Sequence, residues 1–178
     1  MKAHTLFGAA AVATLASAAA AEITIEFENF IAAGANAFPT SENALTGEVT
    51  GAFGDFILNA DGENFTWADD LMVLIANEDF SDILVQMGGY SDFGAAYRGT
   101  WEFGASGDAG TAAGGTIDLG ASVDVTGYTM FLGNGYAGGG NGDWSGLITV
   151  NGSVDYVPAP GALALLGLAG LAGRRRRA

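Results

Sequence analysis

Short apolar runs that alternate with polar residues occupy the chain between residues 22 and 156, and clusters of Gly, Asn and Asp separate them. Ile23, Ile25 and Phe27, for example, have polar neighbours on both sides, which is the pattern of a strand with one buried face. Such runs, separated by turn residues at short intervals, predict an all-β fold. We therefore expect a single β-sandwich domain over residues 22–156.

Further strands are expected along this segment, with Gly-rich stretches between them as loops. The expected strands cover residues 47–58, 100–103, 116–119, 128–132, 147–150 and 153–157, and the expected loops cover residues 104–115 and 133–142. Gly51 and Gly54 are candidates for β-bulges in the first of these strands. The predicted core contains Ile25, Phe53, Phe56, Val73, Ile75, Trp101, Ile117, Phe131 and Ile148.

The segment between residues 67 and 87 fits two interpretations. Its apolar residues recur at helical spacing, which allows two short helices. The consecutive apolar residues at 71–75 equally fit a strand that is buried on both faces. We favour the strand because both flanking segments have β patterns and because Asn77, Glu78 and Asp79 form a typical turn sequence.

Residues 1–21 have the composition of a secretory signal peptide. Lys2 supplies a positive charge, residues 6–15 are apolar and rich in Ala, and residues 19–21 are the small residues that signal peptidase requires. We therefore expect an N-terminal signal helix, cleavage by signal peptidase before Glu22, and export of the chain.

The tail over residues 157–178, VPAPGALALLGLAGLAGRRRRA, combines a proline motif, an uncharged apolar stretch and a cluster of arginines in a fixed order. The residues that define it are Val157, Pro158, Pro160, Arg174, Arg175, Arg176 and Arg177. As a helix, residues 159–173 would measure about 22 Å, which is shorter than a hydrocarbon core of about 30 Å. Snorkelling arginines or local thinning would supply the rest, so we expect a short C-terminal transmembrane helix with its arginines on the cytoplasmic side.

This tail resembles the sorting signal of PEP-CTERM proteins, in which the same three parts stand at the end of the chain. The resemblance implies recognition by an exosortase-type sorting enzyme in the inner membrane. It also implies delivery to the cell envelope, the cell surface or the extracellular matrix of a bacterium. Ala159 stands between the two prolines, where the family usually has Glu.

The charge of the chain is distributed very unevenly. All 20 acidic residues lie within residues 22–156, together with one of the six basic residues, Arg98, so this segment has a formal charge of −19. Such a surface repels phosphate backbones, which argues against nucleic acid as a partner, and it suits divalent cations or salt-rich surroundings. The chain has no cysteine, so packing alone must stabilise the exported domain.

The side chains that most hydrolytic mechanisms need are missing from residues 22–156. The single histidine, His4, lies in the signal peptide, and no lysine or cysteine remains after processing. Nucleophile systems built on Ser and His, and zinc sites built on His, are therefore excluded, and we expect no enzymatic activity. The alternative is a glycan-active enzyme that uses two carboxylates, since the 20 acids offer many pairs.

Oxygen-rich loops make Ca²⁺ the cation to expect, because it prefers carboxylate and amide oxygens. In addition, WADDL at 67–71 is similar to the opening of P-domain-like jelly rolls, and GTW at 99–101 and DWSGL at 143–147 resemble later parts of that family. This resemblance implies a jelly-roll-like topology and a cation ligand at Asp70. The predicted Ca²⁺ ligands are Asp61, Glu63, Asp70 and Asp143, with ordinary Asx turns as the alternative.

Large aromatic side chains offer a stacking platform for carbohydrate, although most are expected to pack in the core. Tyr136 in a Gly-rich loop and Tyr90 in GGYS are the candidate ligand contacts. We expect an exported, non-enzymatic protein of the cell surface or extracellular matrix with a structural or adhesive role, and exopolysaccharide is a candidate partner. A carbohydrate-binding or Ca²⁺-binding module is the alternative.

Overall fold

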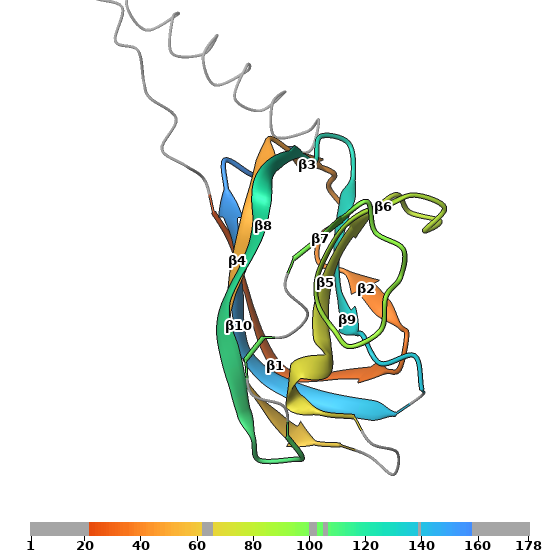
Figure 1. The fold of residues 1–178 in the computed structure, drawn as a ribbon, viewed down its shortest axis with the longest axis vertical. Coiled ribbons are helices and arrows are strands. Elements are labelled where there is room, and N and C mark those ends of the chain that lie inside the picture. The colour runs from red at the N-terminus through yellow and green to blue at the C-terminus, as the bar shows by residue number, and fades with distance from the viewer. Residues whose placement is uncertain (1–21, 62–65, 100–102, 105–106, 139, 158–178) are drawn as a thin grey trace, which may run out of the picture.

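The computed structural model describes residues 22–61, 66–99, 103–104, 107–138 and 140–157. Strands make up most of these residues and no α-helix occurs among them, which confirms the predicted all-β class (Figure 1). Within the described ranges, no helix has the length and apolar character needed to cross a membrane. The predicted signal peptide and all of the sorting tail except Val157 lie outside the described residues.

One sheet has four strands in the order β1-β10-β4-β8, and each strand is antiparallel to its neighbours. Their bounds are β1 Ile23–Ala33, β4 Glu48–Ala60, β8 Ala112–Asp124 and β10 Asn141–Gly152. These are the longest strands of the domain, so this sheet sets its length.

The second sheet has five strands in the order β2-β9-β5-β6-β7, antiparallel except for the pair β6 and β7. Their bounds are β2 Ala37–Pro39, β5 Leu71–Ala76, β6 Ile83–Gly88, β7 Tyr97–Arg98 and β9 Thr129–Asn134. A 3-10 turn, η1 Ala68–Asp70, leads directly into β5. A separate small sheet joins β3 Leu45–Thr46 to β11 Asp155–Tyr156.

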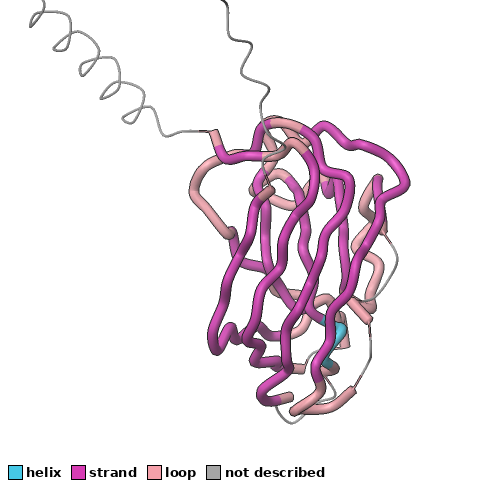
Figure 2. Tube along the Cα trace, turned by 90° about the vertical axis from the view of Figure 1, so that its left-hand side faces the viewer, coloured by secondary structure: helices cyan, strands magenta, loops and turns pink. Residues whose placement is uncertain are grey.

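The two larger sheets form two layers with the main core between them (Figures 1 and 2). Alternate residues of each strand point into this core, because successive side chains of a strand lie on opposite faces. Trp144 of β10 is fully buried there, and its indole Nε1 donates a hydrogen bond to the carbonyl of Ala68 at 3.1 Å. This bond connects η1, and therefore the start of β5, to the opposite sheet.

β5 is buried on both faces, as the strand interpretation of residues 71–75 predicts. Leu71, Val73 and Ile75 belong to the core between the sheets. Met72, Leu74 and Ala76 belong to a second cluster on the outer face of the five-stranded sheet, which Phe93 and other partly buried side chains cover. The helical interpretation is therefore wrong, and the predicted turn at residues 77–79 is present.

Phe53 is a correction to the predicted core. Its side chain is 42% exposed, whereas Val49, Ala52 and Phe56 of the same strand are buried. The pairing of β4 with β10 shifts register between Val49 and Gly51, where β4 has one extra residue, and this is the bulge predicted at Gly51. One extra residue in a strand reverses the faces of all residues after it, so Phe53 points outward.

The other core predictions divide into three groups. Six predicted positions are buried, namely Phe56, Val73, Ile75, Ile117, Phe131 and Ile148. Ile25 is partly buried and packs against the core, and Trp101 lies outside the described residues. Phe103, expected at the end of a strand, is buried but lies in a bend.

Two Gly-rich segments expected to be loops contribute strand residues. β8 begins at Ala112, and Gly114 and Gly115 pair with Asp55 and Gly54 of β4. β9 continues to Asn134, and β10 begins at Asn141. Backbone pairing thus extends into segments that have few apolar side chains, because the ladder needs only backbone groups.

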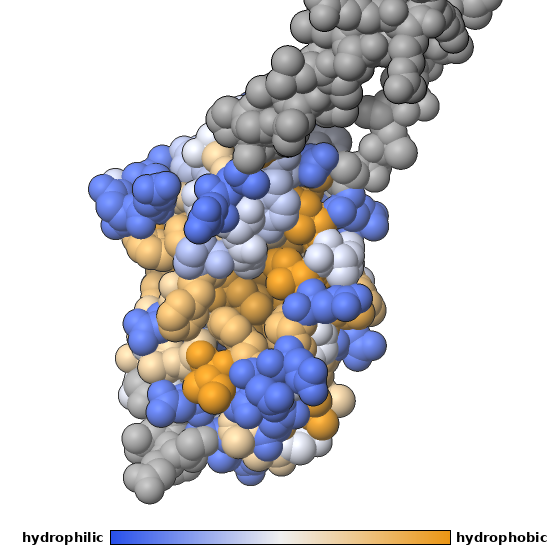
Figure 3. All heavy atoms as spheres, turned by 180° about the vertical axis from the view of Figure 1, so that it is seen from behind, coloured by the Kyte–Doolittle hydropathy of each residue, from blue (hydrophilic) through white to orange (hydrophobic). Residues whose placement is uncertain are grey.

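Apolar side chains also gather on the surface, in the middle of the face shown in Figure 3, with hydrophilic side chains around them. Phe30 of β1 and Phe38 of β2 pack edge to face, with ring centroids 6.1 Å apart. β1 and β2 are edge strands of the two different sheets. Their aromatic contact therefore joins the layers along one side of the domain.

The described chain begins and ends at the same end of the domain (Figure 1). Ile23 at the start of β1 pairs with Val150 near the end of β10. The amide of Val157 donates a hydrogen bond to the carbonyl of Ala44 at 2.8 Å, next to the pair formed by β3 and β11. The opposite end of β1 pairs with the start of β10, close to the loop that follows β9.

Candidate functional site: a braced tyrosine pair

The two tyrosines selected from the sequence lie together. The ring centroids of Tyr90 and Tyr136 are 6.3 Å apart, and the ring planes meet at 62° in an edge-to-face arrangement. Tyr90 follows β6 and Tyr136 follows β9, so two separate loops supply the rings. Tyr90 is 63% exposed and Tyr136 is partly buried, so the pair offers aromatic surface to solvent.

The two loops contact each other through their backbones. The amide of Ser91 donates to the carbonyl of Gly135 at 2.8 Å, and the hydroxyl of Ser91 accepts a hydrogen bond from the amide of Ala137 at 2.9 Å. Gly89 and Gly135 approach so closely that a Cβ at Gly135 would lie 2.4 Å from the Cα of Gly89. A side chain at either glycine would separate the loops and, with them, the rings.

Asn134 fixes the Tyr136 loop to the interior. This fully buried amide directs Nδ2 at the carbonyl oxygens of Ala32 and Gly140 and at the hydroxyl of Thr66, each at 3.3 Å. Its Oδ1 accepts a hydrogen bond from the amide of Tyr136 at 2.9 Å. The backbone of Tyr136 is therefore held by a side chain whose other partners lie on three different segments.

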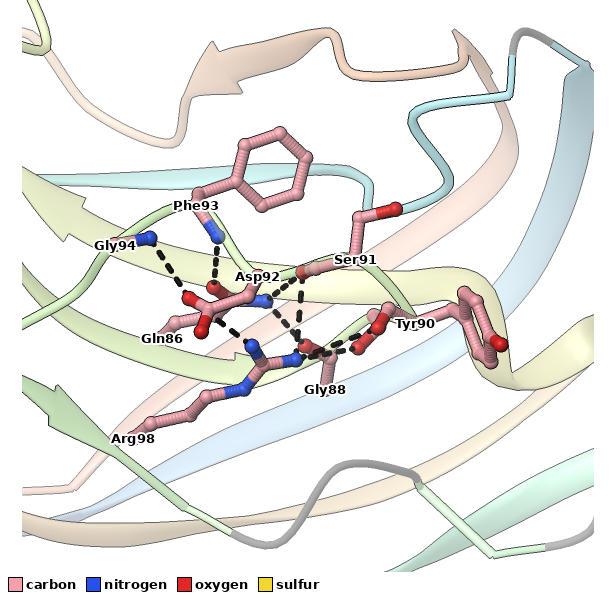
Figure 4. Close-up of polar contacts among 9 residues, drawn as sticks. Gln86, Gly88, Tyr90, Ser91, Asp92, Phe93, Gly94 and Arg98 are labelled. Atoms are coloured by element: carbon pink, nitrogen blue, oxygen red, sulfur yellow. Dashed lines mark hydrogen bonds and ion pairs between the residues drawn. The ribbon is translucent and has the colours of Figure 1, made fainter.

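Arg98 fixes the Tyr90 loop (Figure 4). Its Nη2 donates to the carbonyl oxygens of Gly89, Tyr90 and Ser91 at 3.4, 3.5 and 3.3 Å. Its Nη1 pairs with the carboxylate of Asp92 at 3.1 Å. The only basic residue within 22–156 thus binds the backbone of the loop that carries Tyr90.

Gln86 of β6 binds the same loop from the interior of the domain. The side chain is fully buried, and its Nε2 donates to the carbonyl oxygens of Gly88 and Ser91 at 3.2 and 2.8 Å. Its Oε1 accepts a hydrogen bond from the amide of Phe93 at 3.1 Å (Figure 4). Because these contacts exist before any ligand arrives, binding at the pair costs little ordering entropy.

Two of the predicted Ca²⁺ ligands come together. Asp143 of β10 pairs with Ala60 of β4, and Asp61 is the next residue after Ala60. The carboxylate of Asp143 accepts a hydrogen bond from Nδ2 of Asn59 at 3.3 Å. Asp61 and Asp143 therefore lie at the same end of two neighbouring strands.

Asp70 lies in a different segment, and Glu63 lies outside the described residues. The Asp70 side chain is buried, and its Oδ2 accepts a hydrogen bond from the amide of Trp67 at 2.8 Å. This bond closes the turn of η1 immediately before β5. Among the described residues, no group of three or more His, Cys, Asp or Glu side chains is arranged to hold a metal ion.

Acidic residues also line an open groove at the other end of β9. The groove has a volume of about 520 Å³. It is lined by Glu42, Ala44, Asn77, Glu78, Asp79, Gly127 and Thr129. Hydrogen bonds from Ser81 lower the pKa of Asp79, which keeps this carboxyl ionised. Thr129 begins β9 and Tyr136 follows its end, so the strand separates the groove from the tyrosine pair.

The sequence indicates the two rings but not the residues that position them. The signal that could have identified Asn134 is the sequence Gly-Asn-Gly-Tyr, because Asn before Gly favours a turn in which the side chain accepts the second following amide. Ser91 and Arg98 carry no local signal for their roles, since their partners depend on tertiary contacts. Trp67, one of the large aromatic residues considered for the stacking platform, is exposed just before η1.

Val157 is the one residue of the predicted sorting motif within the described chain. Its amide bonds to Ala44, as described above, and its side chain is exposed. The two prolines and the four arginines of the motif lie outside the described residues.

Comparison with protein-family models, curated proteins and solved structures finds no match to this chain.

Proposed function

We propose that the chain is an exported, non-enzymatic protein of the cell surface or extracellular matrix with a structural or adhesive role. The signal-like residues 1–21 and the tail over residues 157–178 support export and sorting. Signal peptidase and an exosortase-type enzyme are the processing partners. The C-terminal helix occupies the inner membrane, transiently or permanently.

One observation carries the adhesive role: the ends of the described chain and the tyrosine pair lie at opposite ends of the domain. The strand β1, Ile23–Ala33, runs between these ends and covers about 35 Å at ~3.3 Å per residue. A tail fixed in the membrane would therefore direct Tyr90 and Tyr136 away from it. The braced pair would then be the part of the domain that first meets the surroundings of the cell.

The strand connections support a jelly-roll-like topology for this domain. The chain passes repeatedly from one sheet to the other, as between β1 and β2, β4 and β5, and β8 and β9. Neighbouring strands are antiparallel in both sheets except at β7. This topology places the loops at the two ends of the sheets, where the tyrosine pair and the acidic groove lie.

Asp79 of the groove does not suit the general-acid role in a glycan-active enzyme. Such an enzyme needs one carboxyl with a raised pKa to act as the general acid. The pKa of Asp79 is instead lowered by the hydrogen bonds from Ser81. The groove also lies beside Ala44, whose carbonyl binds the residue that leads into the tail.

The chain contains no cysteine, so a single introduced cysteine can be labelled without any background from other thiols. This labelling tests export. In the variant Ala137→Cys, the single thiol lies on an exposed residue beside the tyrosine pair. We expect a membrane-impermeant maleimide to label this thiol on intact cells, and we expect the labelled protein to begin at or near Glu22 by intact mass. Its tail should be removed or membrane-held.

A second variant, in which Arg174, Arg175, Arg176 and Arg177 are replaced by Ser, tests the tail. We expect it to lose the surface labelling of the matched Ala137→Cys protein while the signal peptide is still removed. Recovery of an unlabelled cytoplasmic protein that retains both Met1 and Ala178 would contradict the proposed function.

A further inference from the structure

We propose that Tyr90 and Tyr136 form a stacking site for an uncharged sugar residue of a polysaccharide. The inference rests on the proposed function and names the ligand of its contact site. It is carried by the ring geometry, by the charge around the rings and by the way the two loops are fixed.

The two rings form a corner. Their planes meet at 62° with centroids 6.3 Å apart, in an edge-to-face arrangement, and Tyr90, 63% exposed, keeps open aromatic surface. The negative face of an aromatic ring attracts weakly positive C–H groups, which one side of a pyranose ring presents. A phenol hydroxyl can both donate and accept a hydrogen bond, so each tyrosine also offers a polar contact to sugar hydroxyls.

Charge restricts the ligand to neutral chains. The segment 22–156 carries a formal charge of −19, and its one basic residue, Arg98, is engaged with three carbonyl oxygens and Asp92. An anionic polymer would approach a surface of its own sign without a cation to bind it. Sugar hydroxyls, in contrast, can donate to the exposed carboxylate of Asp92, two residues from Tyr90.

The shape of the surface favours a sugar over a peptide. Proline-rich peptides bind aromatic-lined grooves, which contact several residues of the ligand at once. The acidic groove described above lies at the other end of β9, away from the tyrosine pair. At the tyrosine pair, one exposed ring beside a hydrogen-bonding rim is sufficient for a single sugar ring.

The loops hold the corner in its binding arrangement. Gly89 and Gly135 meet backbone to backbone, and Ser91 bonds to both Gly135 and Ala137. Fixed loops lose little conformational entropy when a ligand binds, so the affinity of even a small contact surface is reduced less. Gly135→Ala would keep both rings and the charge, but it would force the loops apart.

The binding test uses the full chain in a polyoxyethylene detergent, which contains no sugar. Isothermal titration is carried out with neutral oligosaccharides of glucose and of N-acetylglucosamine, with the anionic polymer alginate, and with a proline-rich peptide. We expect at least one neutral oligosaccharide to bind, and we expect no binding of alginate or of the peptide. Tyr90→Ala and Tyr136→Ala should each weaken sugar binding about tenfold or more.

Tyr97→Ala is the matched control, because Tyr97 is an exposed tyrosine on β7 outside the pair. It should bind sugar as the unchanged chain does. Gly135→Ala should weaken binding as much as loss of a ring, although both tyrosines remain. If that variant fails to fold, Ser91→Ala, which removes the acceptor for the amide of Ala137, should weaken binding to a smaller extent.

Three results would overturn the sugar site: no neutral oligosaccharide binds, affinity is unchanged in Tyr90→Ala, or alginate or the peptide binds through the tyrosines. The labelling experiment with Ala137→Cys gives an independent result. Surface labelling without sugar binding would refute only the ligand, whereas sugar binding by a protein that is never labelled on cells would refute only the surface location.

Discussion

Replacing Asn134 with Asp changes one NH₂ group to oxygen in a fully buried side chain that takes part in four hydrogen bonds. Nδ2 now donates toward the carbonyl oxygens of Ala32 and Gly140 and the hydroxyl of Thr66. After the substitution, a carboxylate oxygen would face the two carbonyl oxygens, and neither side would have a hydrogen to share. A negative charge would also be buried at a position with 0% exposure.

A buried charge without a compensating partner typically costs about 3–5 kcal/mol of unfolding free energy. For a domain of this size, each kcal/mol lowers Tm by roughly 3–4 °C, so we expect Asn134→Asp to lower Tm by about 10–20 °C. The assay is thermal melting of the full chain, followed by circular dichroism. Asn36→Asp is the matched control, because it adds the same charge at an exposed position and should change stability by about 0.5 kcal/mol or less.

The difference between the two variants should depend on pH. Burial raises the pKa of the introduced carboxyl at position 134 above its unfolded value of about 3.9, because burial disfavours the charged form. The destabilisation is therefore complete above the raised pKa and is lost as pH falls through it. Equal Tm values for the two variants at neutral pH, or a difference that does not shrink in acid, would refute the assigned role of Asn134.

Three further predictions concern other parts of the domain. Phe56→Ala should cost about 3–5 kcal/mol because Phe56 is only 3% exposed, whereas Phe53→Ala on the outer face should cost roughly 0.5 kcal/mol or less; similar denaturant midpoints for both would contradict the bulge at Gly51. Burial raises the pKa of Tyr156, with the hydrogen bond to Thr40 acting in the opposite direction, so the stability from the neutral phenol is complete below about pH 10 and is lost as pH rises through the raised pKa. In an ultraviolet titration, Tyr156→Phe should lack one tyrosine that ionises at higher pH than an ordinary tyrosine. An unchanged titration curve would contradict the raised pKa of Tyr156. For the predicted Ca²⁺ site, we expect low CaCl₂ to raise Tm beyond NaCl of matched ionic strength and Asp143→Asn to abolish the difference; identical melting curves in the two salts would leave the acids as a solvated surface.

The fold class could be predicted because it depends on local patterns. Alternation identified β1, and a continuous apolar run bounded by turn residues identified β5 as a strand with two buried faces. The orientation of Phe53 could not be predicted with the same rule, since a single bulge reverses the alternation and its position depends on pairing with β10. The order of strands within each sheet could not be predicted either, because contacts between segments far apart in the sequence determine it.

For the candidate site, too, the sequence predicts local features but not contacts between distant segments. Tyr90 and Tyr136 could be selected because Gly-rich surroundings indicate exposed loops. Their contact with each other depends on the close approach of Gly89 and Gly135, which belong to loops after two different strands. A sequence pattern carries no information on such an approach until the pairing of β5 with both β6 and β9 is known.

The position of Tyr136 in the loop between β9 and β10 has a mechanical consequence. A pull between a ligand held at Tyr136 and a fixed tail would run along β10, Asn141–Gly152, and then through β11 to Val157. β10 lies between β1 and β4, so the segment that carries the load is already extended and is paired on both sides. A strand rises about 3.3 Å per residue, close to the limit of a fully extended chain, so the domain should lengthen little along the line that joins its contact site to its anchor.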